Sequence, residues 1–388
     1  MARLRVVTVM PEAPDPFANA ASRWYYVLLK GLADRGHDVR AYAAYTRIAY
    51  ADAARARFAG TPVRLELFPY PDRGGWWGRK WATLRRPYSH FIHSALSDGV
   101  TRALQDGCDI LHLEQTWAGW LGIGKTRALL SVHWLAILDL QGTGFRSWEF
   151  FKAKLLSWYA ERNILRQFKH IRVLTDRLAS GVRRINPDAQ VYVVPFAIDP
   201  TLYPMVENES QEKVVGLIAG MTWEPGYNAA VRLLTSIWGR VRMKEPDARL
   251  VVAGWEARKM LRRFVNEPGV SIVENLPDPL EFYRRCTVLA YPLARGSGMK
   301  VKILEAMAYG VPIVTTSEGI EGVDAENGTH AALEDEDEPF AERVVEMLRD
   351  PSARRCLREA GRVLVEEKYS PKTILPQIEE IYQQMLRA

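Results

Sequence analysis

The stretch that decides the fold is YPLARGSGMKVKILEAMAYGVPIVTT, which spans residues 291–316. Its pattern predicts, in order, a buried strand, a loop of small residues, a helix and a second strand. A strand, a helix and a strand in succession predict a βαβ unit, whose two strands lie parallel in a sheet that helices cover. The stretch therefore favours the α/β class.

The same alternation extends along the rest of the chain, with one pause at 195–204. The sequence predicts a helix over 21–35. It predicts strands over 4–10, 37–43, 63–68, 110–113, 129–132, 171–174, 191–194, 214–219, 250–253, 272–273, 288–291 and 313–315. Two doubly wound parallel sheets, both Rossmann-like, follow from this order. We expect an N-terminal domain at 1–195, a C-terminal domain at 196–366, and a last helix at 367–388 that packs back on the N-terminal domain. Because such sheets bind ligands at the carboxyl ends of their strands, we expect the site in a cleft that both domains face.

Charge is unevenly divided between the two predicted domains. The chain has 388 residues and a net charge of +6; residues 1–195 carry 28 Lys and Arg against 16 Asp and Glu, and residues 196–388 carry 24 against 30. A basic half of this kind either faces an anionic surface or is a solvated face without a partner. No run of about 18 apolar residues predicts a membrane span, and no signal peptide is expected. Three scattered cysteines fit a reducing compartment, so we expect a cytoplasmic protein.

Residues 119–126, GWLGIGKT, match the GxxxxGK[ST] pattern of a nucleotide-binding loop letter for letter. That loop requires a full helix directly after it, because the helix amides hold the phosphate. Only Arg127 and Ala128 separate the match from the next predicted strand. We therefore predict a short helix at about Thr116–Lys125 that links two strands, and no nucleoside triphosphatase.

A second glycine loop offers a better anion site. The small residues at 296–298 let backbone amides approach a ligand, and the following helix points its positive end at the same place. Lys300 and Lys302 add two cations, and Glu305 lies where a carboxylate can accept two hydrogen bonds from a ribose diol. We interpret the loop as a diphosphate site. The alternative is an ordinary tight turn with exposed lysines.

Residues 296–314 resemble GxGxKxKxLEAMAxGxPxV, a donor-site signature of glycosyltransferase family 4. This family comprises retaining enzymes of the GT-B fold, and this form of the signature occurs among sugar transferases of bacterial surface-polysaccharide systems. Further segments also resemble the family: 131–133 (a strand end with an active-site histidine), 194–203 (the interdomain segment), 220–229 (the first donor-domain loop) and 273–278 (the loop at the base).

The resemblance implies a two-domain GT-B fold, a nucleotide-diphosphate sugar as donor, and no metal or other cofactor. It implies roles for His133, Lys302 and Glu305 in catalysis; Arg295, Gly296, Ser297, Gly298, Met299, Lys300 and Thr222 at the donor diphosphate and sugar; Asn275, Leu276 and Glu305 at the base and ribose; and Phe17, Asn19 and Ala20 in an acceptor-side loop. A lone histidine at a strand end is often structural, and this remains the alternative for His133.

The chain departs from the family pattern in the residues that carry charge. Many members have a glutamate where Ser297 stands, and an arginine and a lysine where Met221 and Gly226 stand. We expect the cations within 295–302 to supply the missing positive charge. The departures also leave open a catalytically degenerate partner subunit.

Tryptophans and basic residues gather at 73–88 and again at 146–172. Indole and arginine side chains together are typical of a membrane interface, of sugar stacking or of single-stranded nucleic acid binding. No nucleic-acid-binding signature accompanies them, so we expect no nucleic acid partner. We predict peripheral binding to anionic lipid at the inner face of the membrane, with core packing of these residues as the alternative. His90 and His93 lack a third ligand, so no metal site is predicted.

These patterns together predict a retaining, hexosyltransferase-like enzyme of bacterial polysaccharide or glycoconjugate synthesis. It would move a sugar from a nucleotide-diphosphate sugar to a glycan, a glycolipid or another hydroxyl acceptor. A nucleotide-sugar epimerase or a phosphorylase of similar build, and the degenerate partner subunit, remain the alternatives. The sequence specifies neither the base, nor the sugar, nor the acceptor.

Overall fold

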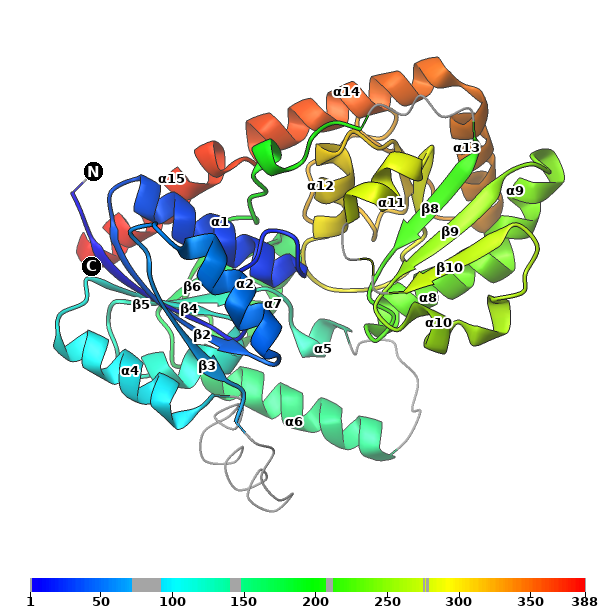
Figure 1. Cartoon of the computed structure of the whole chain (residues 1–388). Helices are drawn as coiled ribbons and strands as arrows, with labels where there is room; N and C mark the ends of the chain where they lie inside the picture. Colours follow the sequence, from blue (N-terminus) through cyan, green and yellow to red (C-terminus); the bar gives the residue numbers. More distant parts are fainter. Residues whose placement is uncertain are drawn as a thin grey trace. The chain divides into compact units, whose positions relative to one another are not determined.

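The computed structural model describes residues 2–71, 92–139, 148–206, 212–274, 276 and 279–387, with the backbone alone over 148–154. The chain forms two compact units, which are taken separately here (Figure 1). The first unit comprises Met1–Ala197 and Pro371–Ala388, and the second comprises Ile198–Ser370. The boundaries predicted from the sequence lie at 195/196 and 366/367.

The first unit is built on a seven-stranded parallel sheet in the order β3-β2-β1-β4-β5-β6-β7. Its central strands are buried on both faces, because apolar residues such as Val6, Val7 and Val9 occupy successive positions. The strands are β1 (Arg5–Met10), β2 (Asp38–Tyr45), β3 (Arg64–Pro69), β4 (Ile110–Glu114), β5 (Ala128–Val132), β6 (His170–Val173) and β7 (Gln190–Val193).

Helices connect these strands and cover the sheet. They are α1 (Ala20–Asp34), α2 (Ile48–Phe58), α4 (Ser94–Gln105), η2 (Thr116–Gly122), α5 (Ala136–Asp139), α6 (Trp148–Leu165) and α7 (Asp176–Ile185), and α15 (Pro371–Arg387) joins them from the end of the chain. The link between β4 and β5 is the short 3-10 helix η2, which confirms the short helix predicted there. The GxxxxGK[ST] match is therefore not a strand–loop–helix phosphate site.

Helix α15 is joined to the first unit by polar contacts as well as apolar ones. The Glu379 carboxylate accepts hydrogen bonds from Arg35 Nε at 2.8 Å and from His37 Nε2 at 2.9 Å. The Tyr382 hydroxyl lies 2.6 Å from His112 Nδ1 in the middle of the sheet. In Figure 1 the red helix α15 lies beside the blue helix α1.

The second unit is built on a six-stranded parallel sheet in the order β10-β9-β8-β11-β12-β13. Its strands are β8 (Val214–Ile218), β9 (Arg249–Gly254), β10 (Val270–Glu274), β11 (Val288–Tyr291), β12 (Ile313–Thr315) and β13 (Ala332–Leu333). Its helices are η3 (Pro200–Leu202), α8 (Glu224–Arg232), the π-helical turn η4 (Leu233–Ile237), α9 (Trp238–Lys244), α10 (Ala257–Met260), η5 (Arg262–Phe264), α11 (Pro279–Arg285), α12 (Val301–Ala308), α13 (Asp337–Arg349) and α14 (Pro351–Lys368). Two doubly wound α/β units confirm the predicted fold class.

Over the described ranges, no helix combines the length and the apolar character needed to cross a membrane.

Candidate functional site

The glycine loop between β11 and α12 is the candidate site of the second unit. Gly296 has φ +140 and Gly298 has φ +86, backbone conformations that glycine adopts without strain. A Cβ at Gly296 would lie 3.1 Å from the Trp223 ring, so the loop passes close against that indole. The loop leads directly into the first turn of α12, where the positive end of the helix dipole favours an anion.

Lys300 fixes this loop from within. The side chain is buried, and its Nζ donates to the carbonyl of Gly296 at 2.8 Å and to the carbonyl of Gly298 at 2.6 Å. Nζ also pairs with the Glu321 carboxylate at 3.1 Å. These three contacts tie the ammonium of Lys300 to the conformation of the loop.

Lys302 and Glu305 lie on the same face of α12, as their spacing predicts. Lys302 Nζ pairs with Glu305 Oε2 at 2.8 Å, and the Tyr283 hydroxyl donates to the same oxygen at 3.1 Å. The Lys302 side chain is 31% exposed, whereas the Glu305 side chain is fully buried. Of the two lysines, Lys302 is therefore the one whose side chain is partly exposed, whereas Lys300 is buried.

The other residues predicted for the donor site differ in how exposed they are. Ser297 and Met299 are buried, whereas Arg295 and Thr222 are exposed. Leu276 is half-buried after β10, and Asn275 lies outside the described residues.

Two tryptophans of this region were not predicted as site residues. Trp223 and Trp255 are 39% and 40% exposed and follow the carboxyl ends of β8 and β9, where a doubly wound sheet binds its ligands. Their position in the loops that follow two predicted strands was the available signal.

The candidate site of the first unit surrounds His133, which follows the carboxyl end of β5. His133 is buried, and its Nε2 lies 2.5 Å from Glu114 Oε2, at the end of the adjacent strand β4. Burial lowers the pKa of His133, against the opposing effect of Glu114, so the ring is held neutral. Burial raises the pKa of Glu114, but the interactions with His112 and His133 outweigh it and hold that pKa well below its usual range.

Aromatic rings enclose the His133 imidazole. The Phe196 ring lies edge-on at 4.7 Å and the Tyr25 ring lies at 5.9 Å. The guanidinium of Arg172 covers the Trp24 ring at 4.1 Å and donates to the carbonyl of Val194 at 3.0 Å. Arg172 thereby fixes the segment that carries Phe196 against His133.

The predicted acceptor-side loop precedes α1. Asn19 caps this helix, since its side chain accepts a hydrogen bond from the Ser22 amide at 3.0 Å. Ala20 is the exposed first residue of the helix. Arg23 is buried and donates to the carbonyls of Ala18 at 2.7 Å and of Phe17 at 3.3 Å, so it holds the loop.

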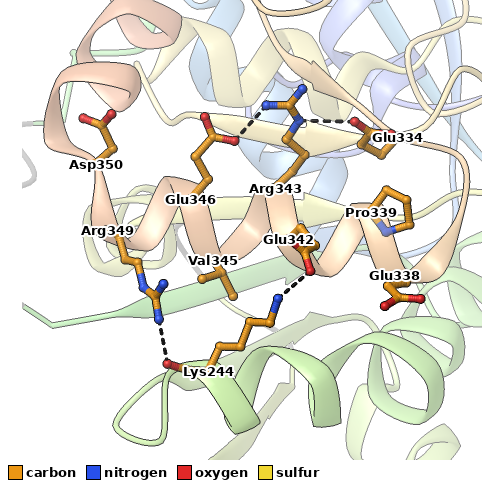
Figure 2. A pocket seen from close by; sticks show the side chains of 10 residues that line it. All are labelled: Lys244, Glu334, Glu338, Pro339, Glu342, Arg343, Val345, Glu346, Arg349 and Asp350. Carbon is orange, nitrogen blue, oxygen red and sulfur yellow. Dashed lines mark hydrogen bonds and ion pairs between the residues drawn. The ribbon is translucent and has the colours of Figure 1, made fainter.

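A separate groove of about 680 Å³ lies on the second unit along α13 (Figure 2). Its walls carry opposite charges that pair with each other. Arg343 contacts Glu334 at 3.2 Å and Glu346 at 2.8 Å, and Lys244 pairs with Glu342. No residue of the predicted donor site lines this groove.

Comparison with known proteins connects both units to one group of enzymes. The family model described as "Glycosyl transferase 4-like domain" matches residues 21–197, and the model described as "Glycosyl transferases group 1" matches residues 212–350. The chain belongs to the glycosyltransferase 4-like family. CapM of Staphylococcus aureus, a capsular polysaccharide biosynthesis glycosyltransferase, is 30% identical to this family member over 129 residues. That match covers 31% of the chain and 32% of CapM, so the chain spans about a third of the length of this curated relative.

Solved structures share the fold of this glycosyltransferase 4-like chain along nearly its whole length. HepE of Anabaena, solved with UDP and glucose, is 14% identical with a TM-score of 0.68, over 98% of this chain and 100% of HepE. A TarM variant of S. aureus, solved with fondaparinux, alpha-GlcNAc-glycerol and UDP, is 10% identical with a TM-score of 0.70, over 98% and 100%. WaaG, a glycosyltransferase involved in lipopolysaccharide biosynthesis, is 14% identical with a TM-score of 0.67, over 97% and 99%. These likenesses confirm the predicted GT-B fold.

Proposed function

We propose that the chain is a retaining glycosyltransferase of surface-polysaccharide synthesis. Its donor would be a nucleotide-diphosphate sugar, and its acceptor a hydroxyl of a glycan or a lipid-linked glycan. The observation that carries the proposal is the glycine loop that Lys300 fixes at the start of α12, with Lys302 beside it. HepE binds UDP and glucose on the same fold, and TarM binds UDP with glycan ligands, which supports a donor and an acceptor of this kind.

In this proposal the loop amides and Lys302 stabilise the negative charge that develops on the departing diphosphate. Preorganised donors aimed at developing charge are commonly the largest contribution to catalysis. Lys300 acts indirectly, because its ammonium keeps the Gly296 and Gly298 carbonyls turned inward. Glu305 is proposed to bind the ribose diol, and it also holds Lys302 through the 2.8 Å ion pair. Lys302 and the amides need no metal ion beside them.

On the acceptor side, His133 is proposed to contact the transferred sugar. The loop of Phe17, Asn19 and Ala20 is proposed to receive the acceptor, since Arg23 holds its backbone and α1 begins there. Backbone near Leu276 is proposed to contact the base. No side chain is assigned as a covalent nucleophile, so the acceptor oxygen would attack the anomeric carbon from the side that the diphosphate leaves.

A thermal-shift screen of nucleotide sugars and nucleoside diphosphates tests the donor class. A ligand at a hundredfold excess over its Kd stabilises the fold by about 2.7 kcal/mol, which raises the melting temperature measurably. The ligand that gives the largest shift is then incubated with the chain, with and without glycan acceptors. Transfer with retained anomeric configuration supports the proposal. A new sugar nucleotide formed without acceptor indicates an epimerase, and binding without turnover indicates a partner subunit.

We further propose that the first unit binds anionic lipid at the inner face of the membrane, where a lipid-linked acceptor would lie. Helix α6 exposes Leu155, Leu156, Trp158 and Tyr159, and the Arg162 guanidinium lies 5.5 Å from the Trp158 ring. Apolar and aromatic residues beside cations suit a membrane interface. The stretch at 73–88 lies outside the described residues.

Vesicle sedimentation tests this second proposal. Binding is expected to require anionic lipid and to weaken with salt, because each basic residue near the surface contributes about 1 kcal/mol. The paired change of Leu155→Ser and Trp158→Ser is expected to reduce binding, whereas Val363→Ser on exposed α14 serves as the matched control. Equal binding to neutral and anionic vesicles would contradict the proposal.

A further inference from the structure

The carboxylate of Glu114, at the end of β4, is fully buried and has three side-chain nitrogens close to it. Trp24 Nε1 donates to Oε1 at 2.8 Å, and His112 Nε2 lies 3.1 Å from the same oxygen. His133 Nε2 lies 2.5 Å from the other oxygen, Oε2. His112 Nε2 is hydrogen-bonded to the Ser131 hydroxyl at 2.8 Å. Because an ionised carboxylate only accepts hydrogen bonds, Trp24 Nε1 and His133 Nε2 must each carry a proton that faces Glu114.

The position of the His133 proton follows from this contact. With the proton on Nε2, a neutral imidazole carries its lone pair on Nδ1. His133 Nδ1 is buried and meets no hydrogen-bond partner among the residues that the structure describes. The Phe196 and Tyr25 rings restrict rotation of the imidazole, so the Nδ1 lone pair has a fixed direction.

Two further observations distinguish this cluster from an ordinary buried ion pair. The Tyr382 hydroxyl contacts His112 Nδ1 at 2.6 Å, and His112 Nε2 lies 3.1 Å from Glu114, so a line of polar contacts runs from α15 through His112 and Glu114 to His133. Gln115, directly after Glu114, has φ +64 and ψ 154, a conformation that is nearly restricted to glycine. Its side chain donates to the Tyr25 hydroxyl at 2.9 Å. Strained backbone of this kind concentrates at functional sites.

We propose that Glu114 is a positioning residue that keeps the His133 proton on Nε2, so that Nδ1 accepts a hydrogen bond from a hydroxyl of the transferred sugar. The sugar contact rests on the proposed function, whereas the placement of the proton does not. Glu114 does not touch the sugar and acts through His133.

The proton position is measured directly by nitrogen NMR of the full chain with labelled histidine. The chain has seven histidines, and the His133→Gln variant identifies the signal of His133. We expect a neutral ring with its proton on Nε2 at neutral pH, without any donor present. A proton on Nδ1, or a charged ring, would overturn the proposal, and only the assignment of the signal uses a variant.

The Glu114→Gln variant reverses the direction of the hydrogen bond between residue 114 and His133, and the side chain keeps nearly the same size. The indole N–H of Trp24 can only donate and meets Oε1, so the amide oxygen takes that place and the amide NH₂ group faces His133. An NH₂ group requires an acceptor, and we therefore expect the His133 proton to move to Nδ1. The sugar then loses its acceptor, so kcat/KM is expected to fall on the order of ten- to a hundredfold, as for other orienting carboxylates. Affinity for the free nucleoside diphosphate is expected to stay unchanged.

Tyr382→Phe is the matched control, because it removes a hydroxyl from the same line of polar contacts and leaves the Glu114–His133 contact in place. This variant is expected to keep the proton on Nε2. An unchanged proton position in Glu114→Gln, or a moved proton with full activity, would overturn the proposal. A wild-type chain that has the expected proton position but transfers no sugar from any donor contradicts the proposed function instead, and leaves the proton placement supported.

Discussion

At the scale of single residues, Lys300 and Lys302 show how two similar side chains take different roles. They lie two positions apart, and successive residues at a helix start do not share a face. Lys300 is buried on its own loop, whereas Lys302 is partly exposed beside Glu305. The first is a structural ammonium, and the second can meet an anion that arrives from solvent.

Lys302→Ala is expected to lower turnover about a hundredfold or more, the scale seen when one preorganised charge stabiliser is removed. Lys302→Arg, which keeps the charge, is expected to retain part of the activity. Lys300→Ala is expected to act through stability, because two buried carbonyls lose a charged donor at about 1–3 kcal/mol each. Steady-state kinetics and thermal unfolding of the three variants separate these effects. A larger loss of turnover in Lys300→Ala at unchanged melting temperature would contradict the assignment.

Glu305→Gln tests whether this carboxylate binds the donor or only holds Lys302. Loss of a charged hydrogen bond to the ribose costs on the order of 1.5–3 kcal/mol and is expected to appear as a higher donor KM. If the carboxylate serves Lys302 alone, kcat falls while KM stays constant. Donor titrations of turnover give both constants. Unchanged kcat and KM would remove Glu305 from the site.

At the scale of elements, helix α6 fixes the short helix that follows His133. Glu161 on α6 is almost fully buried, and its Oε1 accepts a hydrogen bond from the Ala136 amide at 2.6 Å, at the start of α5. Burial raises the pKa of Glu161 to about 7, although the amides of Ala136 and Ile137 oppose this shift. The Glu161 side chain therefore couples the position of α5 to protonation of its own carboxyl group.

The raised pKa gives Glu161 a definite effect on stability against pH. The folded chain binds this proton more tightly than the unfolded chain, whose glutamate pKa is about 4.3, so the contribution is most favourable in acid. It is lost as the pH rises from about 4.3 to the folded pKa of about 7, and amounts to on the order of 4 kcal/mol. Glu161→Gln keeps an acceptor for Ala136 but does not titrate. Urea unfolding at pH 5 and pH 8 is therefore expected to show a smaller decrease for the variant; equal decreases would contradict this.

Strands and helices could be predicted wherever the hydrophobic pattern of a short stretch of sequence is enough to identify them. The twelve predicted strands all occur, because runs such as Val288–Tyr291 are apolar at every position and are buried in a parallel sheet. The strand β13 was missed, since Ala332 and Leu333 are too short a run to show any period. The shared face of Lys302 and Glu305 follows from helical spacing alone.

Contacts between distant residues were not predictable in the same way. Lys300 binds carbonyl oxygens of its own loop, and no residue pattern encodes where a backbone carbonyl points. Glu114 lies 90 residues from Trp24 and 19 from His133, and becomes important only when β4 and β5 lie side by side.

At the scale of the whole molecule, the first unit is discontinuous in sequence. Residues 198–370 form the second unit, and the chain then returns to add α15 to the first. Side chains of α15 are almost fully buried there, among them Ile374, Ile378 and Tyr382. The first unit therefore depends on the last helix for part of its core.

Ending the chain after Ser370 is expected to unfold the first unit and spare the second. Each fully buried large apolar side chain contributes about 1.5–3 kcal/mol, so the loss of several exceeds a typical stability of 5–15 kcal/mol. Calorimetry and limited proteolysis are expected to show one remaining transition and a resistant fragment near 198–370. The full-length Glu379→Gln variant, which weakens the contacts with Arg35 and His37, is expected to show only a lowered first transition. Two intact transitions in the truncated chain would contradict the prediction.

The return of α15 also sets an order of events on the ribosome. Chains grow at about 5–20 residues per second, so synthesis of the second unit delays the emergence of α15 by roughly ten to thirty-five seconds. During that interval His37 and His112 have not yet met Glu379 and Tyr382. The nascent first unit exposes the surface that α15 later covers, which is the condition under which chaperones bind. The part of the protein that is synthesised first thus completes its fold last.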